Sequence, residues 1–238
     1  MKILVTGAAG FIGFNFCNYL LSKINPNIVV GIDNLNNYYD IKLKKKRLKI
    51  LKKNKRFKYY KVDINNKKKI EKIFKRFKFD FVLNLAAQAG VRYSIDHPRK
   101  YVDSNILGFY NIIENSRKYN IKRLFYASSS SVYGENKKFP LIEKENLSPI
   151  NHYAYTKVIN EQTGKYYSDN FNLNIYMLRF FTVYGKWGRP DMFLFKLFKS
   201  AIKKNSFELN NNGNHERDFT YVEDVCEILL KVMKKKIN

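Results

Sequence analysis

Short apolar runs alternate with longer segments of mixed polarity along the 238-residue chain. A short apolar run with polar or glycine residues around it is typical of a strand buried on both faces, and the segments between the runs are long enough for helices. Parallel strands need such helical crossovers, so the pattern predicts an α/β fold with a doubly wound parallel sheet. The strands are expected at residues 2–6, 28–32, 57–62, 80–85, 122–128 and 174–179.

The first predicted strand leads into a glycine-rich turn, Gly7-Ala8-Ala9-Gly10-Phe11-Ile12-Gly13. Gly7 and Gly10 let the backbone turn tightly and approach a pyrophosphate, whose charge the N-terminus of the next helix favours, and Gly13 allows close helix packing. Asp33 follows at the end of the second strand, where its carboxylate can accept both hydroxyls of an adenosine ribose and repel a 2′-phosphate. The arrangement predicts a Rossmann-type site that prefers NAD to NADP.

Tyr153 and Lys157 are four residues apart in a predicted helix, which places both side chains on one face. A tyrosine ionises near pH 10, so its use as a base near neutrality requires about 4 kcal/mol, which an ammonium ~4 Å away can supply. The pair alone is weak evidence in a chain with 18 Tyr and 45 Lys plus Arg. The predicted strand 122–128, however, runs into serines that include Ser129 and Ser130, and such strand ends face the ligand crevice.

The net charge of +25 is mostly lysine, concentrated in helix-like stretches such as residues 42–53. Leu43, Leu48, Ile50 and Leu51 leave a partial helical stripe in that stretch, so the lysines are expected to form its solvated face. A nucleic-acid surface more often combines arginines with aromatic residues. No nucleic-acid partner is therefore expected, because charge alone affects solubility and steering.

Other compositional features exclude some classes of protein. No apolar run approaches the ~18 residues of a membrane span, so no membrane partner is expected. Only Cys17 and Cys226 are present, without a C-x-x-C pair, which indicates a reducing cytoplasm. No metal site is expected.

With the glycine turn, the serine strand and the Tyr-Lys pair, the chain resembles the extended short-chain dehydrogenase/reductases, and within them the UDP-glucuronate 4-epimerases. The resemblance covers essentially the whole chain. Its more specific stretches are Ala-Gln-Ala-Gly-Val-Arg at 87–92 and Gly-Arg-Pro-Asp-Met at 188–192, and further ones occur at 101–105, 179–185 and 216–222.

The resemblance implies NAD as a retained catalyst and inversion at C4 of a UDP-sugar through a 4-keto intermediate. Tyr153 takes the proton from the sugar O4, Ser129 orients that oxygen, and Lys157 also holds the nicotinamide ribose. The cofactor residues are expected to be Gly7, Gly10, Phe11, Ile12, Gly13, Asp33, Asp63, Ile64, Leu85, Ala86, Ala87, Tyr153, Lys157 and Val183. The substrate residues are expected to be Ser130, Thr182, Arg189 at the uronate carboxylate and Arg217 at the diphosphate. A homodimer is also implied.

Two competing interpretations stay open. Dehydratases of the superfamily place Asp-Glu after the catalytic hydroxyl residue, and decarboxylases usually carry an acidic residue there, whereas this chain has Ser130-Ser131. Family members also continue beyond the Arg217-Asp218-Phe219 stretch, whereas this chain ends at Asn238. We therefore expect an NAD-binding domain at 1–178, to which about 219–238 returns, and a small, incomplete substrate-binding lobe at 179–218. The alternatives are another nucleotide-sugar epimerase or dehydratase, or an NAD-binding protein without activity.

Overall fold

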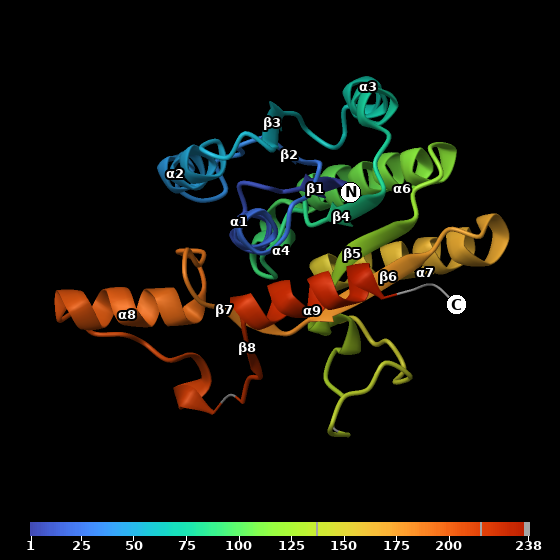
Figure 1. The fold of residues 1–238 in the computed structure, drawn as a ribbon. Coiled ribbons are helices and arrows are strands. Elements are labelled where there is room, and N and C mark those ends of the chain that lie inside the picture. The colour runs from blue at the N-terminus through green and yellow to red at the C-terminus, as the bar shows by residue number, and fades with distance from the viewer. Residues whose placement is uncertain (137, 215, 236–238) are drawn as a thin grey trace.

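The computed structural model describes residues 1–136, 138–214 and 216–235. Six parallel strands form one sheet in the order β3-β2-β1-β4-β5-β6 (Figure 1). Each predicted strand is present, and its ends lie within one residue of the prediction. The strands are β1 (Lys2–Thr6), β2 (Ile28–Asp33), β3 (Phe57–Lys61), β4 (Phe81–Asn84), β5 (Arg123–Ser129) and β6 (Ile175–Phe180).

Helices cover both faces of this sheet, which confirms the doubly wound α/β prediction (Figure 1). They are α1 (Phe11–Lys23), α2 (Ile41–Leu51), α3 (Lys67–Phe77), α4 (Tyr93–Asp96), α5 (Pro98–Tyr101), the π-helix η1 (Val102–Leu107), α6 (Gly108–Lys118), the 3-10 helix η2 (Ser130–Tyr133), α7 (His152–Phe171), α8 (Phe193–Lys203), the 3-10 helix η3 (Asn210–Gly213) and α9 (Val222–Lys234). In the described part of the chain, no helix is long and apolar enough to cross a membrane.

The core consists of two hydrophobic layers, one on each face of the sheet. Successive side chains of a strand point to opposite faces, so Ile3 and Val5 lie in the layer under α1, α2 and α9, whereas Leu4 lies in the layer under α3, α6 and α7. The runs that the sequence shows as continuously apolar are therefore buried on both faces, as expected for central parallel strands.

The chain beyond β6 forms a smaller structure that extends from one end of the sheet (Figure 1). Strand β7 (Thr182–Tyr184) pairs in parallel with β8 (Phe219–Tyr221), and α9 then packs against α1. Helix α8 is amphipathic in sequence, but none of its residues is buried, and Phe198 and Ile202 are exposed by 64% and 83%.

The lysine-rich stretch forms α2, but two of its basic residues differ from the solvated face that we predicted. Lys44 and Arg47 are buried, whereas Lys45 and Lys46 are exposed. The guanidinium of Arg47 donates to the carbonyl of Ala9 in the glycine turn at 2.8 Å. It also donates to the Tyr39 hydroxyl and to the carbonyls of Trp187 and Gly188. Arg47 therefore joins α2, the glycine turn and the segment after β7.

Replacement of Arg47 by Met should lower the free energy of unfolding by about 3 kcal/mol or more, because several carbonyls buried around the guanidinium lose a charged donor. Lys46→Met, an exposed change in the same helix, should leave the stability unchanged. Urea denaturation of the two variants and the parent protein tests this. Equal midpoints for the two variants would show that the buried contacts contribute no net stability.

Candidate active site

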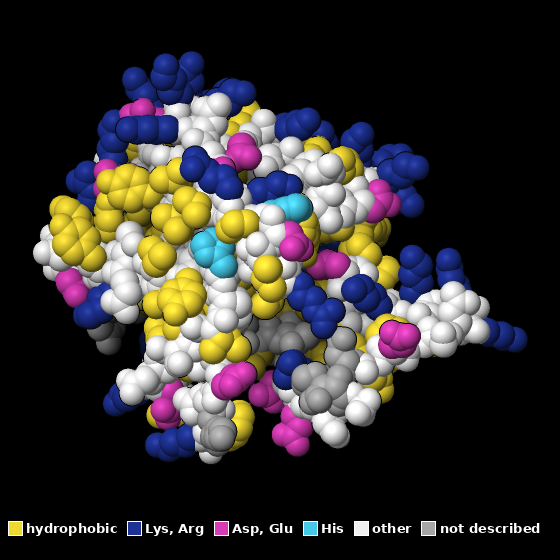
Figure 2. Space-filling view, turned by 180° about the vertical axis from the view of Figure 1, so that it is seen from behind, with side chains coloured by type: hydrophobic (Ala, Val, Ile, Leu, Met, Phe, Trp, Pro, Cys, Tyr) yellow, Lys and Arg dark blue, Asp and Glu magenta, His cyan; other side chains and the backbone are white. Residues whose placement is uncertain are grey.

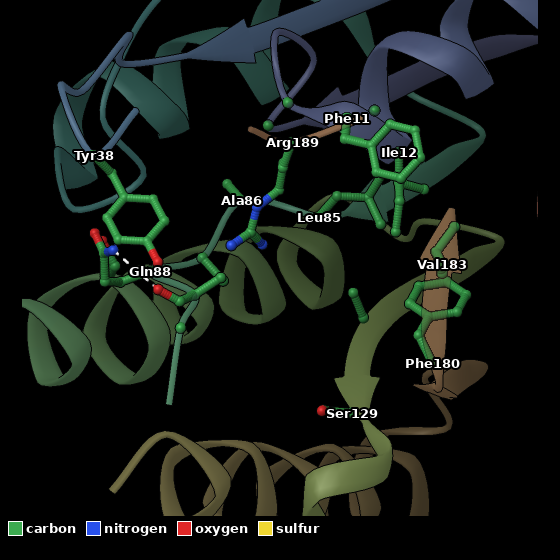
Figure 3. A pocket seen from close by; sticks show the side chains of 18 of the residues that line it. Phe11, Ile12, Tyr38, Leu85, Ala86, Gln88, Ser129, Phe180, Val183 and Arg189 are labelled. Atoms are coloured by element: carbon green, nitrogen blue, oxygen red, sulfur yellow. Dashed lines mark hydrogen bonds between the residues drawn. The ribbon is translucent and has the colours of Figure 1, made fainter. Parts of the chain in front are cut away.

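A cavity of about 550 Å³ opens at the carboxyl ends of the strands. It lies beside the point where the strand order reverses between β1 and β4, which is where ligands bind in open α/β sheets. Figure 3 shows Tyr38 and Arg189 on one side of it and Ser129, Phe180 and Val183 across from them. All the predicted site residues line this cavity except Arg217.

The glycine turn lines the cavity at the start of α1. Gly7 has a positive φ of +67°, and a Cβ there would lie 2.9 Å from the nitrogen of Ala86. A Cβ on Gly13 would lie 2.2 Å from the Gly7 carbonyl oxygen, so any side chain there would separate the helix from the turn. Gly10 precedes the helix, and no side chain caps it. The amide groups of this helix terminus are thus available to a pyrophosphate, and the turn fits NAD.

Asp33 lies at the end of β2 and is 8% exposed. Its carboxylate accepts hydrogen bonds from the backbone N–H groups of Ala9, at 3.1 Å, and Leu35, at 2.8 Å. Burial raises the pKa of Asp33 above its ordinary value, and these N–H groups and the nearby Lys44 and Arg47 oppose that rise. The same contacts orient the carboxylate at the edge of the cavity.

The remaining predicted cofactor residues surround the cavity. Asp63 is oriented by the side-chain amide of Asn34 at 2.8 Å and by the N–H of Asn65 at 2.9 Å. Along with Asp63, the wall contains Phe11, Ile12, Ile64, Leu85, Ala86, Ala87 and Val183.

Tyr153 and Lys157 project from the first turns of α7, whose N-terminus is capped by Asn151 through the N–H of Ala154. Lys157 Nζ lies 5.6 Å from the centre of the Tyr153 ring and donates to the carbonyl of Ala127 at 2.7 Å. Helix α7 packs against β5, so the pair lies beside the serines at the end of that strand. The predicted one-face arrangement of the pair is present.

The electrostatics of the pair differ from the simple picture drawn from the sequence. Burial raises the pKa of Tyr153, while its hydrogen bond with Ser129 and the charge of Arg189 act to lower it. Burial also lowers the pKa of Lys157 to about 7, which the charge of Glu161 opposes. In this structure burial thus disfavours the very ammonium that is expected to favour the ionised tyrosine, and Glu161 opposes this effect.

Ser129 ends β5 and is held by the next helical turn. Its Oγ accepts from the N–H of Ser131 at 3.2 Å and lies 2.9 Å from the Ser131 hydroxyl. With Oγ accepting from that N–H, the Ser129 proton is free to be donated toward the Tyr153 hydroxyl or a substrate oxygen. Ser130 and Thr182 also line the cavity.

Arg189 reaches into the cavity from the segment between β7 and α8 (Figure 3). It forms a two-bond ion pair with Asp191 through Nε, at 3.0 Å, and Nη2. Asp191 in turn accepts from the hydroxyl of Tyr38 at 3.2 Å. Arg217, in contrast, is exposed and donates to the carbonyl of Glu216, so the structure does not bring it to the cavity.

Several residues of the cavity and of its support were not predicted from the sequence. Tyr38, Lys44 and Asp191 line the cavity. Glu161 does not line the cavity but accepts a hydrogen bond from Ser128, next to Ser129. It follows Lys157 by four residues on α7, as Lys157 follows Tyr153, and this spacing could have indicated from the sequence that it lies on the same face of the helix.

Comparison with known proteins agrees with this geometry. Residues 3–238 match the NAD dependent epimerase/dehydratase family. The chain is 48% identical over 236 residues to Protein CapI of Staphylococcus aureus, covering 99% of this chain and 70% of that protein. It is 40% identical to the UDP-glucuronate 4-epimerase of Thermodesulfobacterium geofontis, covering 97% of this chain and 71% of that protein.

A solved structure has the same fold. The UDP-glucuronic acid 4-epimerase from Bacillus cereus, in complex with UDP-glucuronic acid and NAD, superposes with a TM-score of 0.94 at 35% identity, covering all of this chain and 74% of that one. The match over nearly the whole chain and the shared fold lead to one conclusion: the protein belongs to the NAD dependent epimerase/dehydratase family.

Proposed function

We propose that the protein is an NAD-dependent nucleotide-sugar 4-epimerase that converts UDP-glucuronate to UDP-galacturonate. The observation that carries this proposal is a single cavity whose lining includes the glycine turn and Asp33 as well as Tyr153, Ser129 and Arg189. The similarity to two UDP-glucuronate 4-epimerases supports the choice of sugar.

The chemistry assigned to the chain is proton transfer at the sugar O4. NAD, when bound, supplies the acceptor of hydride from C4 and its donor in the reverse direction. Tyr153 removes the O4 proton as the general base and returns it to the epimer. Ser129 donates a hydrogen bond that orients O4, and Lys157 favours the ionised tyrosine. The serine pair after Ser129 offers no carboxyl group for water elimination, which favours epimerisation over dehydration.

The sugar is distinguished by its carboxylate, which we assign to Arg189. Its guanidinium is partly buried and paired with Asp191, so a uronate would bind an arginine that is already oriented. Ser130 and Thr182 also line the cavity and are assigned to the sugar. Arg217 is assigned to the diphosphate, although in this structure it lies outside the cavity.

We further propose a division into an NAD-binding domain (1–178, with about 219–238) and a substrate-binding lobe (179–218), although 236–238 lie outside the described residues.

We also propose a homodimer. Tyr155, Ile159 and Tyr166 are exposed along α7, and Leu107 and Tyr110 are exposed on η1 and α6, which pack against α7. Figure 2 shows hydrophobic side chains gathered over the region of α6 and α7, whereas Lys and Arg are scattered.

Asp33 should set the cofactor preference. Asp33→Asn keeps the shape of the side chain but removes the charge that repels a 2′-phosphate, so the affinity for NAD should fall and approach that for NADP. Asp40→Asn, in the segment that follows, should leave both affinities unchanged. Calorimetric titration with each cofactor measures this. Equal affinities of the unmodified protein for NAD and NADP would rule out the assignment.

Tyr153→Phe should abolish the C4 chemistry while NAD binding stays within a few-fold, because the ring remains and only the hydroxyl is lost. Loss of a general base costs roughly 10²- to 10⁴-fold in rate. Tyr155→Phe provides the matched control, since Tyr155 is 54% exposed on the same helix. Epimerisation is followed by separating the two UDP-uronates. Undiminished turnover in the Tyr153 variant would move the role of base to another residue.

Arg189 should determine the preference for the charged sugar. A charge-assisted contact of about 1.5 to 3 kcal/mol corresponds to a preference for UDP-glucuronate over UDP-glucose of roughly ten- to a hundredfold. Arg189→Ala should remove this preference, whereas Lys186→Ala, an exposed cation in the same segment, should retain it. The measurement is kcat/KM for both sugars. A preference that persists without Arg189 would assign the carboxylate to other residues of the cavity.

A further inference from the structure

Glu161 is a buried carboxylate behind the proposed catalytic pair. It follows Lys157 by one helical turn on α7, as Lys157 follows Tyr153, so the three side chains share one stripe of the helix. It is only 5% exposed, and Lys157 is 2% exposed. Carboxylates buried to this degree are rare unless they are paired.

Glu161 is joined to the ends of two strands. Arg179, on β6, donates to its carboxylate from Nε, at 3.1 and 3.2 Å, and from Nη2, at 2.8 Å. The hydroxyl of Ser128, on β5, donates to the same carboxylate. Arg179 also donates to the Tyr133 hydroxyl and to the carbonyl of Glu143, both at 3.0 Å. The carboxylate thus holds β5 next to Ser129 and ties it to α7.

Lys157 is surrounded by charged and aromatic groups from several elements. On its own helix it is faced by Tyr153 and by Glu161, and its Nζ lies 4.8 Å from the ring centre of Tyr126 on β5. Two further cations act on these neighbours of Lys157: Arg179 on β6 is paired with Glu161, and the charge of Arg189 acts on Tyr153. Among the described residues, Glu161 is the carboxylate whose charge acts on Lys157.

We propose that Glu161 is a positioning residue for the reaction, which holds the Ser128 end of β5 against α7 and provides the negative charge that balances the Lys157 ammonium. This rests on the proposed roles of Tyr153 and Lys157. Burial disfavours an ammonium, and an opposite charge nearby favours it. Arg179 is paired with the same carboxylate, so its positive charge weakens the stabilisation of the Lys157 ammonium by Glu161.

The proposal predicts effects of opposite sign for two substitutions. Glu161→Gln keeps the shape and an acceptor for Arg179 but removes the charge, so Lys157 should lose its proton at a lower pH. Arg179→Gln removes the cation that is paired with Glu161. The carboxylate should then stabilise the Lys157 ammonium more strongly, so the ammonium should persist to a higher pH. A purely structural role for the pair would instead affect the two variants alike, through lost stability without a shift in titration.

The experiment follows the titration of Lys157 by NMR in the cofactor-free protein with 13C-labelled lysine, and Lys157→Met assigns the signal. The titration midpoint should fall by about one pH unit or more in Glu161→Gln and rise in Arg179→Gln. Asp169→Asn, which breaks the exposed Lys165–Asp169 pair on the same helix, should change nothing. Arg179→Lys retains the cation, so its Lys157 midpoint should match that of the parent protein. This variant keeps the comparison possible if Arg179→Gln does not fold.

The pH dependence of epimerisation provides the functional readout. In Glu161→Gln the acid limb of kcat/KM should move to higher pH, because an unassisted Tyr153 ionises later. Shifts of the same sign in Glu161→Gln and Arg179→Gln, or an unmoved Lys157 midpoint in Glu161→Gln, would overturn the proposal. The NMR titration uses neither sugar nor NAD, so it separates the outcomes: the expected midpoints without conversion of UDP-glucuronate would count against the proposed function and not against Glu161.

Discussion

The common direction of the six strands is the constraint on which the site depends. Parallel strands bring all their carboxyl ends to one edge, and the reversal of strand order between β1 and β4 leaves space there. The two strand ends at this point are tied together, since the Thr6 hydroxyl donates to the Asn84 side chain and accepts from the N–H of Ala86 at 2.9 Å. The glycine turn, Asp33 and the serines after β5 are thereby brought to one cavity although they are distant in sequence.

Buried charges connect the parts of the molecule that the sheet alone does not join. Most of the net charge of +25 is carried by exposed lysines, yet a few cations are almost fully buried. Arg47 donates to backbone carbonyls in the glycine turn and in the segment after β7. Arg123, at the start of β5, donates to the carbonyls of Val232 and Met233 and so holds the end of α9. Each of these cations donates to several oxygen atoms, which offsets much of the cost of its burial. Within the described residues, the buried Nε of Arg47 and that of Arg123 have no hydrogen-bond partner.

The cofactor and substrate sides of the cavity differ in how completely they are enclosed. On the cofactor side, the glycine turn, Asp33 and the apolar wall are packed against the sheet. On the substrate side, α8 contributes no buried residue and Arg217 is exposed. The chain spans about 70% of the length of the bacterial relatives with which it was compared. The cofactor contacts are thus the better defined half of the proposed site.

The sequence by itself determined the strands, the glycine turn and a preference for NAD, because these depend on periodicity and on spacings within one or two adjacent elements. The family followed from the resemblance of its longer motif stretches to known proteins. Only the tertiary structure decided which charged side chains are buried. The Tyr38–Asp191 bond joins residues 153 positions apart, the Arg47–Trp187 contact spans 140, and Glu161 meets Arg179 from a different element. A lysine or arginine in a helical pattern looks the same whether its partner is water or a distant carbonyl. The partners of Lys44, Arg47 and Lys157 depend on packing between elements, which local patterns do not encode.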